Sequence, residues 1–110
     1  MSVGVAPPYF YYYKDYIMNK TEVSALISAL QNGIVNITFK KIITNEIRIM
    51  ESSLNPEILR KNGVGTILES VSPDSDHIAV WCIDKGAWRS FRVNTVTGWE
   101  IMQWTMSFYG

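Results

Sequence analysis

The amino-acid sequence predicts a mostly β protein that begins with one helix and continues as a small barrel. Three observations support this fold class. Apolar residues recur at helical spacing between residues 19 and 33, the period changes to two from residue 34 onward, and turn-forming residues separate the later segments at short intervals. A chain of 110 residues is long enough for one domain with a single hydrophobic core.

The predicted helix begins after Asn19, which is a good N-cap residue. Glu22 stands three residues later, as in a capping box, in which each residue of the pair satisfies a backbone N–H of the other. The apolar stripe that should face the sheet consists of Val23, Leu26, Ile27 and Leu30. Gly33 is expected to end the helix in the left-handed conformation that glycine adopts without strain.

The first two strands are predicted as a hairpin, formed by "VNITFKK" and "EIRIMES". Apolar residues alternate with other residues in both segments, at Val35, Ile37 and Phe39 in the first and at Ile47 and Ile49 in the second. Residues 40–45 form the connecting loop, which is basic at its start.

The middle of the chain is predicted to hold a turn or short helix and a third strand. In "LNPEILRKNG", the pair Asn55-Pro56 favours a turn, and proline suits the first position of a helix. The segment "GTILESV", residues 65–71, is predicted as a strand that ends at the polar loop "SPDSD".

A second hairpin is predicted from "HIAVWCID" and "AWRSFRV", joined at Asp84-Lys85-Gly86, where Gly86 can take a positive φ. "NTVTG", residues 94–98, is long enough for one 3₁₀ turn, and "WEIMQW" is the last strand. Several short strands, a leading helix and a tight turn before the final strand are typical of a small SH3-like or Sm-like five-stranded barrel.

Residues 1–18 differ in composition from the barrel domain predicted for residues 19–110. Pro7-Pro8 favours an extended path, and six of the eight residues from Tyr9 to Tyr16 are aromatic. Such an arm would pack on its own barrel or on a neighbouring copy, or would serve as a platform on which bases stack. The candidate interface residues are Tyr9, Phe10, Tyr11, Tyr12, Tyr13 and, in the aromatic C-terminal segment, Trp104.

Two blocks of this sequence resemble the WYL family of Sm/SH3-like barrels, in the short form encoded by tailed bacteriophages. The block "VNITFKK…NEIRIMESSLNP" is similar to the family's opening hairpin, whose second strand has a central Arg and whose following turn ends in Pro. The block "HIAVWCIDKGAWRSFRVNTVTGWEI" is similar to the closing hairpin, which carries an Arg-Ser/Thr-Phe-Arg motif. The order and spacing of the blocks also agree with the family.

Two features differ from the family pattern. The Trp-Tyr-Leu triplet is not evident before His77, and Asn94-Thr95-Val96 stands where Asp-Arg-Ile is usual. In larger members the barrel is a ligand-sensing or regulatory module attached to a DNA-binding domain. This sequence shows no helix-turn-helix, so we do not expect a regulator that acts through that route.

Composition argues against most other classes of protein. Ten basic and ten acidic residues cancel, so any electrostatic binding must come from a local patch. A single Cys82 fits a reducing compartment and a buried thiol, and a single His77 leaves no set of residues for a metal site. We expect no catalytic residues, no metal, no cofactor and no membrane span, and hence a cytoplasmic protein.

The candidate binding surface is the closing hairpin. If Phe91 faces the core, Trp88 and Arg92 face outward, while Arg89 is directed inward and must lie at a rim, at a bulge or beside a carboxylate. Other cations that could join this surface are Lys85, Arg48, Lys40 and Lys41. Three interpretations stay open, namely salt bridges to Glu46, Glu51 or Glu100, a protein interface, or a nucleic-acid surface.

Two functional hypotheses result. The first is a small, non-enzymatic, phage-type binding or regulatory protein that acts on host nucleic-acid machinery, through protein or nucleic-acid contacts, in the cytoplasm of the host. The second is a structural or oligomeric interaction protein, for example an inhibitor of a host protein, that uses the aromatic arm and the last strand as its interface.

Overall fold

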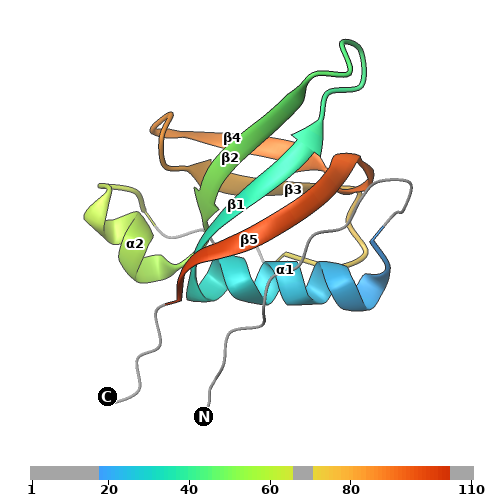
Figure 1. The fold of residues 1–110 in the computed structure, drawn as a ribbon. Helices are drawn as coiled ribbons and strands as arrows, with labels where there is room; N and C mark the ends of the chain where they lie inside the picture. Colours follow the sequence, from blue (N-terminus) through green and yellow to red (C-terminus); the bar gives the residue numbers. More distant parts are fainter. Residues whose placement is uncertain (1–17, 66–70, 105–110) are drawn as a thin grey trace.

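The computed structural model describes residues 18–65 and 71–104. Five antiparallel strands form one strongly curved sheet, and the helix α1 (Lys20–Asn32) lies across one side of it (Figure 1). The predicted fold class, mostly β with an N-terminal helix, is therefore confirmed. The segment "GTILESV", predicted as a strand, lies mostly in residues 66–70, outside the described residues, as do residues 1–17 of the predicted arm.

Helix α1 starts and packs as the sequence predicts. The Oδ1 atom of Asn19 accepts a hydrogen bond from the backbone N–H of Glu22 at 2.9 Å, and the Glu22 carboxylate accepts one from the backbone N–H of Asn19 at 2.8 Å. This reciprocal capping box satisfies N–H groups that the helix itself cannot. The residues of the apolar stripe are all buried against the sheet: Val23, Leu26, Ile27 and Leu30. Met18, just before the cap, is buried with them.

Gly33 does not form the predicted left-handed cap. Its φ of 174° is extended, and it is already the first residue of strand β1 (Gly33–Lys40). A glycine is needed here because β5 (Val96–Trp104) passes directly over it, so that an added Cβ would overlap with the carbonyl of Gln103. The prediction of a left-handed conformation was wrong, and close backbone approach is the reason for the glycine.

The sheet has the strand order β4-β3-β2-β1-β5. Strand β2 (Ile47–Ser53) pairs with β1 along its whole length. It pairs with β3 (His77–Cys82) only at its last two residues, where Ser52 faces Cys82 and Ser53 faces Trp81. The remaining part of the β1–β2 hairpin therefore extends away from β3 (Figure 1).

The two edge strands of the sheet follow one another in the chain. Strand β4 (Ala87–Arg92) is joined to β5 by a single 3₁₀ turn over Val93–Thr95. These three residues cannot span an open sheet, so the edges must meet at this corner, and the sheet curls as in a barrel. The 3₁₀ turn was predicted within residues 94–98, whereas the structure starts β5 already at Val96.

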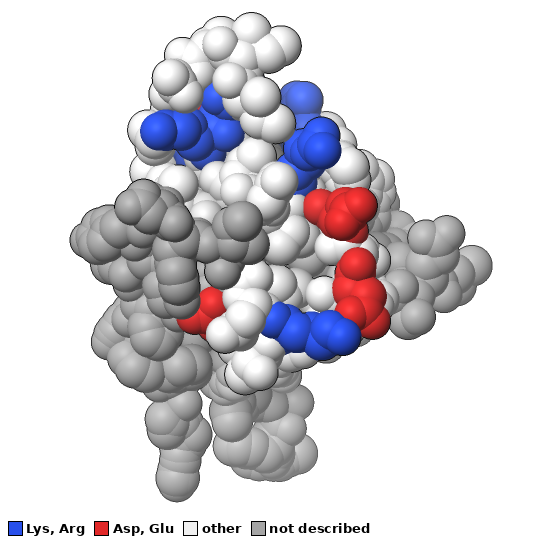
Figure 2. All heavy atoms as spheres, turned by 90° about the vertical axis from the view of Figure 1, so that its right-hand side faces the viewer, with Lys and Arg blue, Asp and Glu red and all other residues white. Residues whose placement is uncertain are grey.

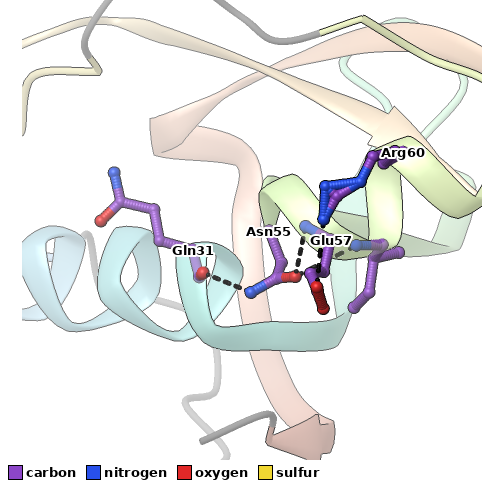
Figure 3. A network of polar contacts seen from close by, with 5 residues as sticks. Gln31, Asn55, Glu57 and Arg60 are labelled. Atoms are coloured by element: carbon purple, nitrogen blue, oxygen red, sulfur yellow. Dashed lines mark hydrogen bonds and ion pairs between the residues drawn. The ribbon is translucent and has the colours of Figure 1, made fainter. Parts of the chain in front are cut away.

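The short helix α2 (Pro56–Lys61) confirms the prediction made from Asn55-Pro56. The Asn55 side chain accepts hydrogen bonds from the backbone N–H groups of Glu57 at 3.0 Å and Ile58 at 3.1 Å, and it donates one to the backbone carbonyl of Gln31 at 2.9 Å (Figure 3). One buried amide therefore starts α2 and ties it to the end of α1.

The isoleucines of β2 face away from the core, although apolar residues that alternate in a strand usually face it. Val35 and Ile37 of β1 are buried as their alternation predicts, and their partners on β2 are Ser52 and Met50, which are also buried. Ile47 and Ile49 therefore point outward and are 53% and 61% exposed. The alternation in "EIRIMES" was correct, but its apolar set does not face the core.

Replacing Gly33 by alanine should destabilise the fold by about 3 kcal/mol or more, because the methyl group would separate β1 from β5. Chemical denaturation of Gly33→Ala against the wild type measures this loss. Gly65→Ala is the matched control, since no atom of the described residues lies within 4 Å of the position of its added Cβ. Equal midpoints for the two variants would show that the close approach at Gly33 does not matter.

Asn55→Ala should lower the free energy of unfolding by about 2 kcal/mol, because it removes the α2 cap and leaves the Gln31 carbonyl without its donor. Asn94→Ala is the control, because that exposed side chain makes no hydrogen bond within the described part of the chain. Thermal unfolding of both variants checks the prediction, and similar losses would contradict it.

Candidate functional site

Two neighbouring clefts lie between the projecting β1–β2 hairpin and the edge strand β4. The first, of about 450 Å³, is bounded by residues 39–44 on the hairpin and by Ser90, Phe91 and Arg92 on β4. The second, of about 320 Å³, lies between residues 48–50 of β2 and the start of the β3–β4 hairpin, including Asp84 and Arg89. Phe39 and Lys41 line both clefts, so the two are adjacent. We call the two clefts together the cationic groove.

Cations dominate the lining of this groove. Six of the lining residues are basic: Lys40, Lys41, Arg48, Lys85, Arg89 and Arg92. The lining contains one carboxylate, Asp84. Figure 2, which views the molecule from the right-hand side of Figure 1, shows cationic side chains on the upper part of that face, and acidic side chains together with a further cationic one below. The groove is therefore a local positive patch on a chain with no net charge.

Arg89 lies at the rim of the groove. On β4 it is paired with Val80, whose side chain is fully buried, so strand alternation does direct Arg89 toward the inner face. It is nevertheless exposed, because the β1–β2 hairpin has diverged from β3 at this point and leaves the inner face open. A rim, a bulge and a neighbouring carboxylate were the three surroundings expected for Arg89, and the structure shows the rim.

Of the expected salt bridges, one forms within residues 18–65 and 71–104, where Arg48 contacts Glu46 at 3.6 Å. Both side chains are about half exposed and lie on the same hairpin, so this pair does not close the barrel. The other two ion pairs of this region join Lys20 to Asp74 and Arg60 to Glu57. Arg89 and Arg92 have no carboxylate partner there, so their charges are available to another molecule.

Trp88 lies outside the groove. It packs against its cross-strand neighbour Trp81 edge to face, with ring centroids 5.5 Å apart and planes at 78°. Trp88 is 40% exposed on the outer face of β4, whereas Arg89 belongs to the inner face. The structure therefore brings most of the predicted cations together but separates the tryptophan from them.

The sequence interpretation missed an apolar component of the site. Four isoleucines of the hairpin are exposed to at least half of their surface: Ile42, Ile43, Ile47 and Ile49. Ile42 and Ile43 lie in the loop and line the larger cleft, and Ile49 lines the smaller one. The available signal was four isoleucines within the eight residues "IITNEIRI", two of them in a loop. Such a cluster of exposed aliphatic side chains marks an interaction surface.

Cys82 forms part of the wall of the smaller cleft, but burial and a hydrogen bond keep its thiol from reacting. The side chain is 1% exposed, and Sγ donates a hydrogen bond to the Asp84 carboxylate at 3.1 Å. Burial raises the pKa of the Cys82 thiol, and the Asp84 carboxylate raises it further, because both disfavour the thiolate. The prediction of a buried cysteine is confirmed.

The remaining predicted residues have the following positions. Tyr9 to Tyr13 are outside the described residues. Trp104 is half-buried at the end of β5, opposite Gly33, and its indole N–H has no hydrogen-bond partner in the described part. The described residues contain no group of three His, Cys, Asp or Glu side chains that could hold a metal ion.

A family profile with the description "WYL_2, Sm-like SH3 beta-barrel fold" matches residues 23–96 of this chain. The chain belongs to the WYL_2 family. The match starts within α1, includes both hairpins and ends at the first residue of β5, so it contains every residue of the cationic groove. Searches of curated proteins and of solved structures returned no significant match.

Membership in WYL_2 agrees with the strand order and with the closing 3₁₀ turn. Sm-like SH3 barrels are typically non-catalytic. Among the described helices of this WYL_2 protein, none has the length and apolar character needed to cross a bilayer.

Iodoacetamide should label Cys82 about 100-fold more slowly in the folded protein than in urea, because the thiol is buried and protonated. The raised pKa also predicts a pH dependence. Stability due to the protonated thiol is complete below the pKa of the unfolded state, about 8.5, and is lost as the pH rises through the higher folded pKa. The denaturation midpoint of the wild type should therefore fall above pH 9 relative to that of Cys82→Ala. Rapid labelling without denaturant would contradict the burial.

Proposed function

We propose that this chain is a small, non-enzymatic regulatory protein of the tailed-phage type that acts on host nucleic-acid machinery by binding a protein component at the cationic groove. The observation that carries the proposal is the combination, in one groove, of exposed isoleucines with six cations, of which Arg48 alone has a carboxylate partner among the described residues. Activity in the host cytoplasm is part of the same proposal, because a target of this kind is found there.

The apolar component favours a protein partner over a nucleic acid. Surfaces that bind single strands combine cations with exposed aromatic rings on which bases stack. In the groove the aromatic residues are Phe39, which is half-buried, and Phe91, which is 3% exposed, while Trp88 lies outside. Arginine beside aliphatic side chains that lose contact with water is instead typical of protein interfaces.

A non-enzymatic role agrees with the chemistry of the described residues. His77 and Cys82 stand at opposite ends of β3, too far apart for a nucleophile and its base. Cys82 is held as a thiol, and the acidic residue of the groove, Asp84, accepts its hydrogen bond. The groove can therefore attract and hold an anionic group, but nothing in it suggests a bond-breaking step.

Self-association is the second candidate function. The outer face of the hairpin exposes Ile47 and Ile49, and β5 exposes Met102 at 52%. Burying these side chains against another copy would stabilise an oligomer, as the hypothesis of a structural protein requires. Sedimentation of the full chain at increasing concentration, with Ile47→Ser as the comparison, tests this alternative.

The proposed function is tested with tagged full-length protein incubated in a bacterial lysate. The wild type should retain a host protein involved in nucleic-acid metabolism, and the double variant Arg48→Ala/Arg89→Ala should retain at least about tenfold less, because both guanidinium groups line the groove. Lys61→Ala, an exposed cation on α2, is the control. Equal retention by the double variant would rule out the groove as the binding site.

Binding of the same proteins to single- and double-stranded DNA and RNA over a salt series separates the nucleic-acid interpretation from this one. We expect no affinity that depends steeply on salt. A steep dependence that disappears in the double variant would assign the groove to nucleic acid instead.

A further inference from the structure

The edge of β4 forms one side of the cationic groove. Ser90, Phe91 and Arg92 are consecutive, and all three line the larger cleft. Successive side chains of a strand point to opposite faces, so a cleft that three of them share must open along the edge of the strand. Strand β4 is terminal in the sheet, and no strand of the described chain covers its second edge. Backbone donors and acceptors therefore accompany the cations in the groove.

The length of the groove suits a short extended peptide. Strand β4 contains six residues, so its edge extends over ~20 Å at ~3.3 Å per residue. An extended segment of about six residues has the same length and can hydrogen-bond to a free strand edge. A phosphodiester backbone lacks the N–H donors that such pairing requires.

The charges of the groove are distributed at its two ends. Lys85 and Arg89 line one cleft with Arg48, and Lys40 and Arg92 line the other, while Lys41 is shared. Apolar surface is concentrated in the larger cleft, which the exposed Ile42 and Ile43 line together with Ser90, Phe91 and Arg92 of β4. A complementary segment would carry carboxylates toward both ends and a large apolar side chain at the larger cleft.

The chain itself offers no good occupant among its other segments. Residues 1–17 contain Asp15 beside Lys14, residues 66–70 contain Glu69, and residues 105–110 contain no acidic residue. None of them has two carboxylates separated by an apolar residue. An acidic segment of a different protein fits the charge of the groove better.

We infer that the cationic groove binds an extended acidic segment of the partner protein along the edge of β4, with a large apolar side chain of that segment against Ile42 and Ile43. This inference rests on the proposed function and adds the chemistry of the partner. Arg48 and Arg89 hold carboxylates at one end, and Lys40 and Arg92 hold them at the other.

Fluorescence anisotropy with the full chain tests this inference, using the labelled peptide Glu-Asp-Val-Leu-Val-Asp-Glu. The peptide should bind with a Kd of the order of 10–100 μM, as is usual for short segments that must be ordered on binding. A peptide with Lys in place of every acidic residue should bind at least about tenfold more weakly, and so should one with Ser in place of Leu. Oligouridine serves as the nucleic-acid probe and should not compete with the acidic peptide.

Charge reversal identifies the residues and the orientation. Arg89→Glu should weaken binding of the acidic peptide about tenfold. Two further peptides carry Lys in place of the acidic residues at one end only. One of them should restore binding to Arg89→Glu, because only one end of the bound peptide meets residue 89. Ile43→Ser, at a position that is 93% exposed, should weaken binding without affecting the fold. Lys61→Glu is the matched control and should leave binding unchanged.

Three results would overturn the inference. The first is that Arg89→Glu leaves binding of the peptide unaffected, and the second is that oligouridine displaces the peptide. The third is that a second copy of the chain occupies the groove, which sedimentation would show as a dimer that the peptide dissociates. If the peptide does not bind while capture of a host protein still requires Arg48 and Arg89, the inference fails and the proposed function survives. If the peptide binds by the expected residues but no host protein is captured, the proposed function fails alone.

Discussion

The short contact between β2 and β3 determines the shape of this protein. Ser52 and Ser53 are fully buried where the two strands meet, and the Ser53 hydroxyl donates a hydrogen bond to the Gly33 carbonyl at 2.7 Å and accepts one from the N–H of Asn55 at 3.0 Å. This one side chain connects the start of β1, the end of β2 and the cap of α2. Beyond the hydrogen bond that the Glu51 carbonyl accepts from Ile83, β2 follows β1 alone, so the hairpin projects and a groove opens beside β4.

The fold was predictable wherever local chemistry and tertiary packing favour the same result. The capping box at Asn19, the stripe of α1 and the positive φ of Gly86, which is 63°, all depend on near neighbours in the chain. Gly33 and β2 differ because their surroundings come from elsewhere. The glycine is required by β5, about 70 residues away in sequence, and small serines fill the crowded position that isoleucines would otherwise occupy.

The candidate site was predictable in its charges but not in its shape. Arg48, Arg89, Lys85 and Lys41 could be proposed because basic residues on two hairpins are expected to lie near the surface. That they share a cleft depends on how far β2 separates from β3, and period-two alternation carries no such information. The same alternation made Ile47 and Ile49 resemble core residues, although the hairpin that carries them has no layer packed on its outer side.

A groove with excess positive charge on a chain of zero net charge has consequences for recognition. Attraction at long range is weak, because the acidic residues elsewhere cancel the field beyond about one Debye length, ~8 Å at physiological salt. The cations therefore act mainly after contact, when a partner excludes water from the groove and each pair becomes stronger. Association then depends on how well carboxylates and apolar side chains are placed, and on burial of Ile42 and Ile43. This favours selection among short peptide segments over capture of any polyanion.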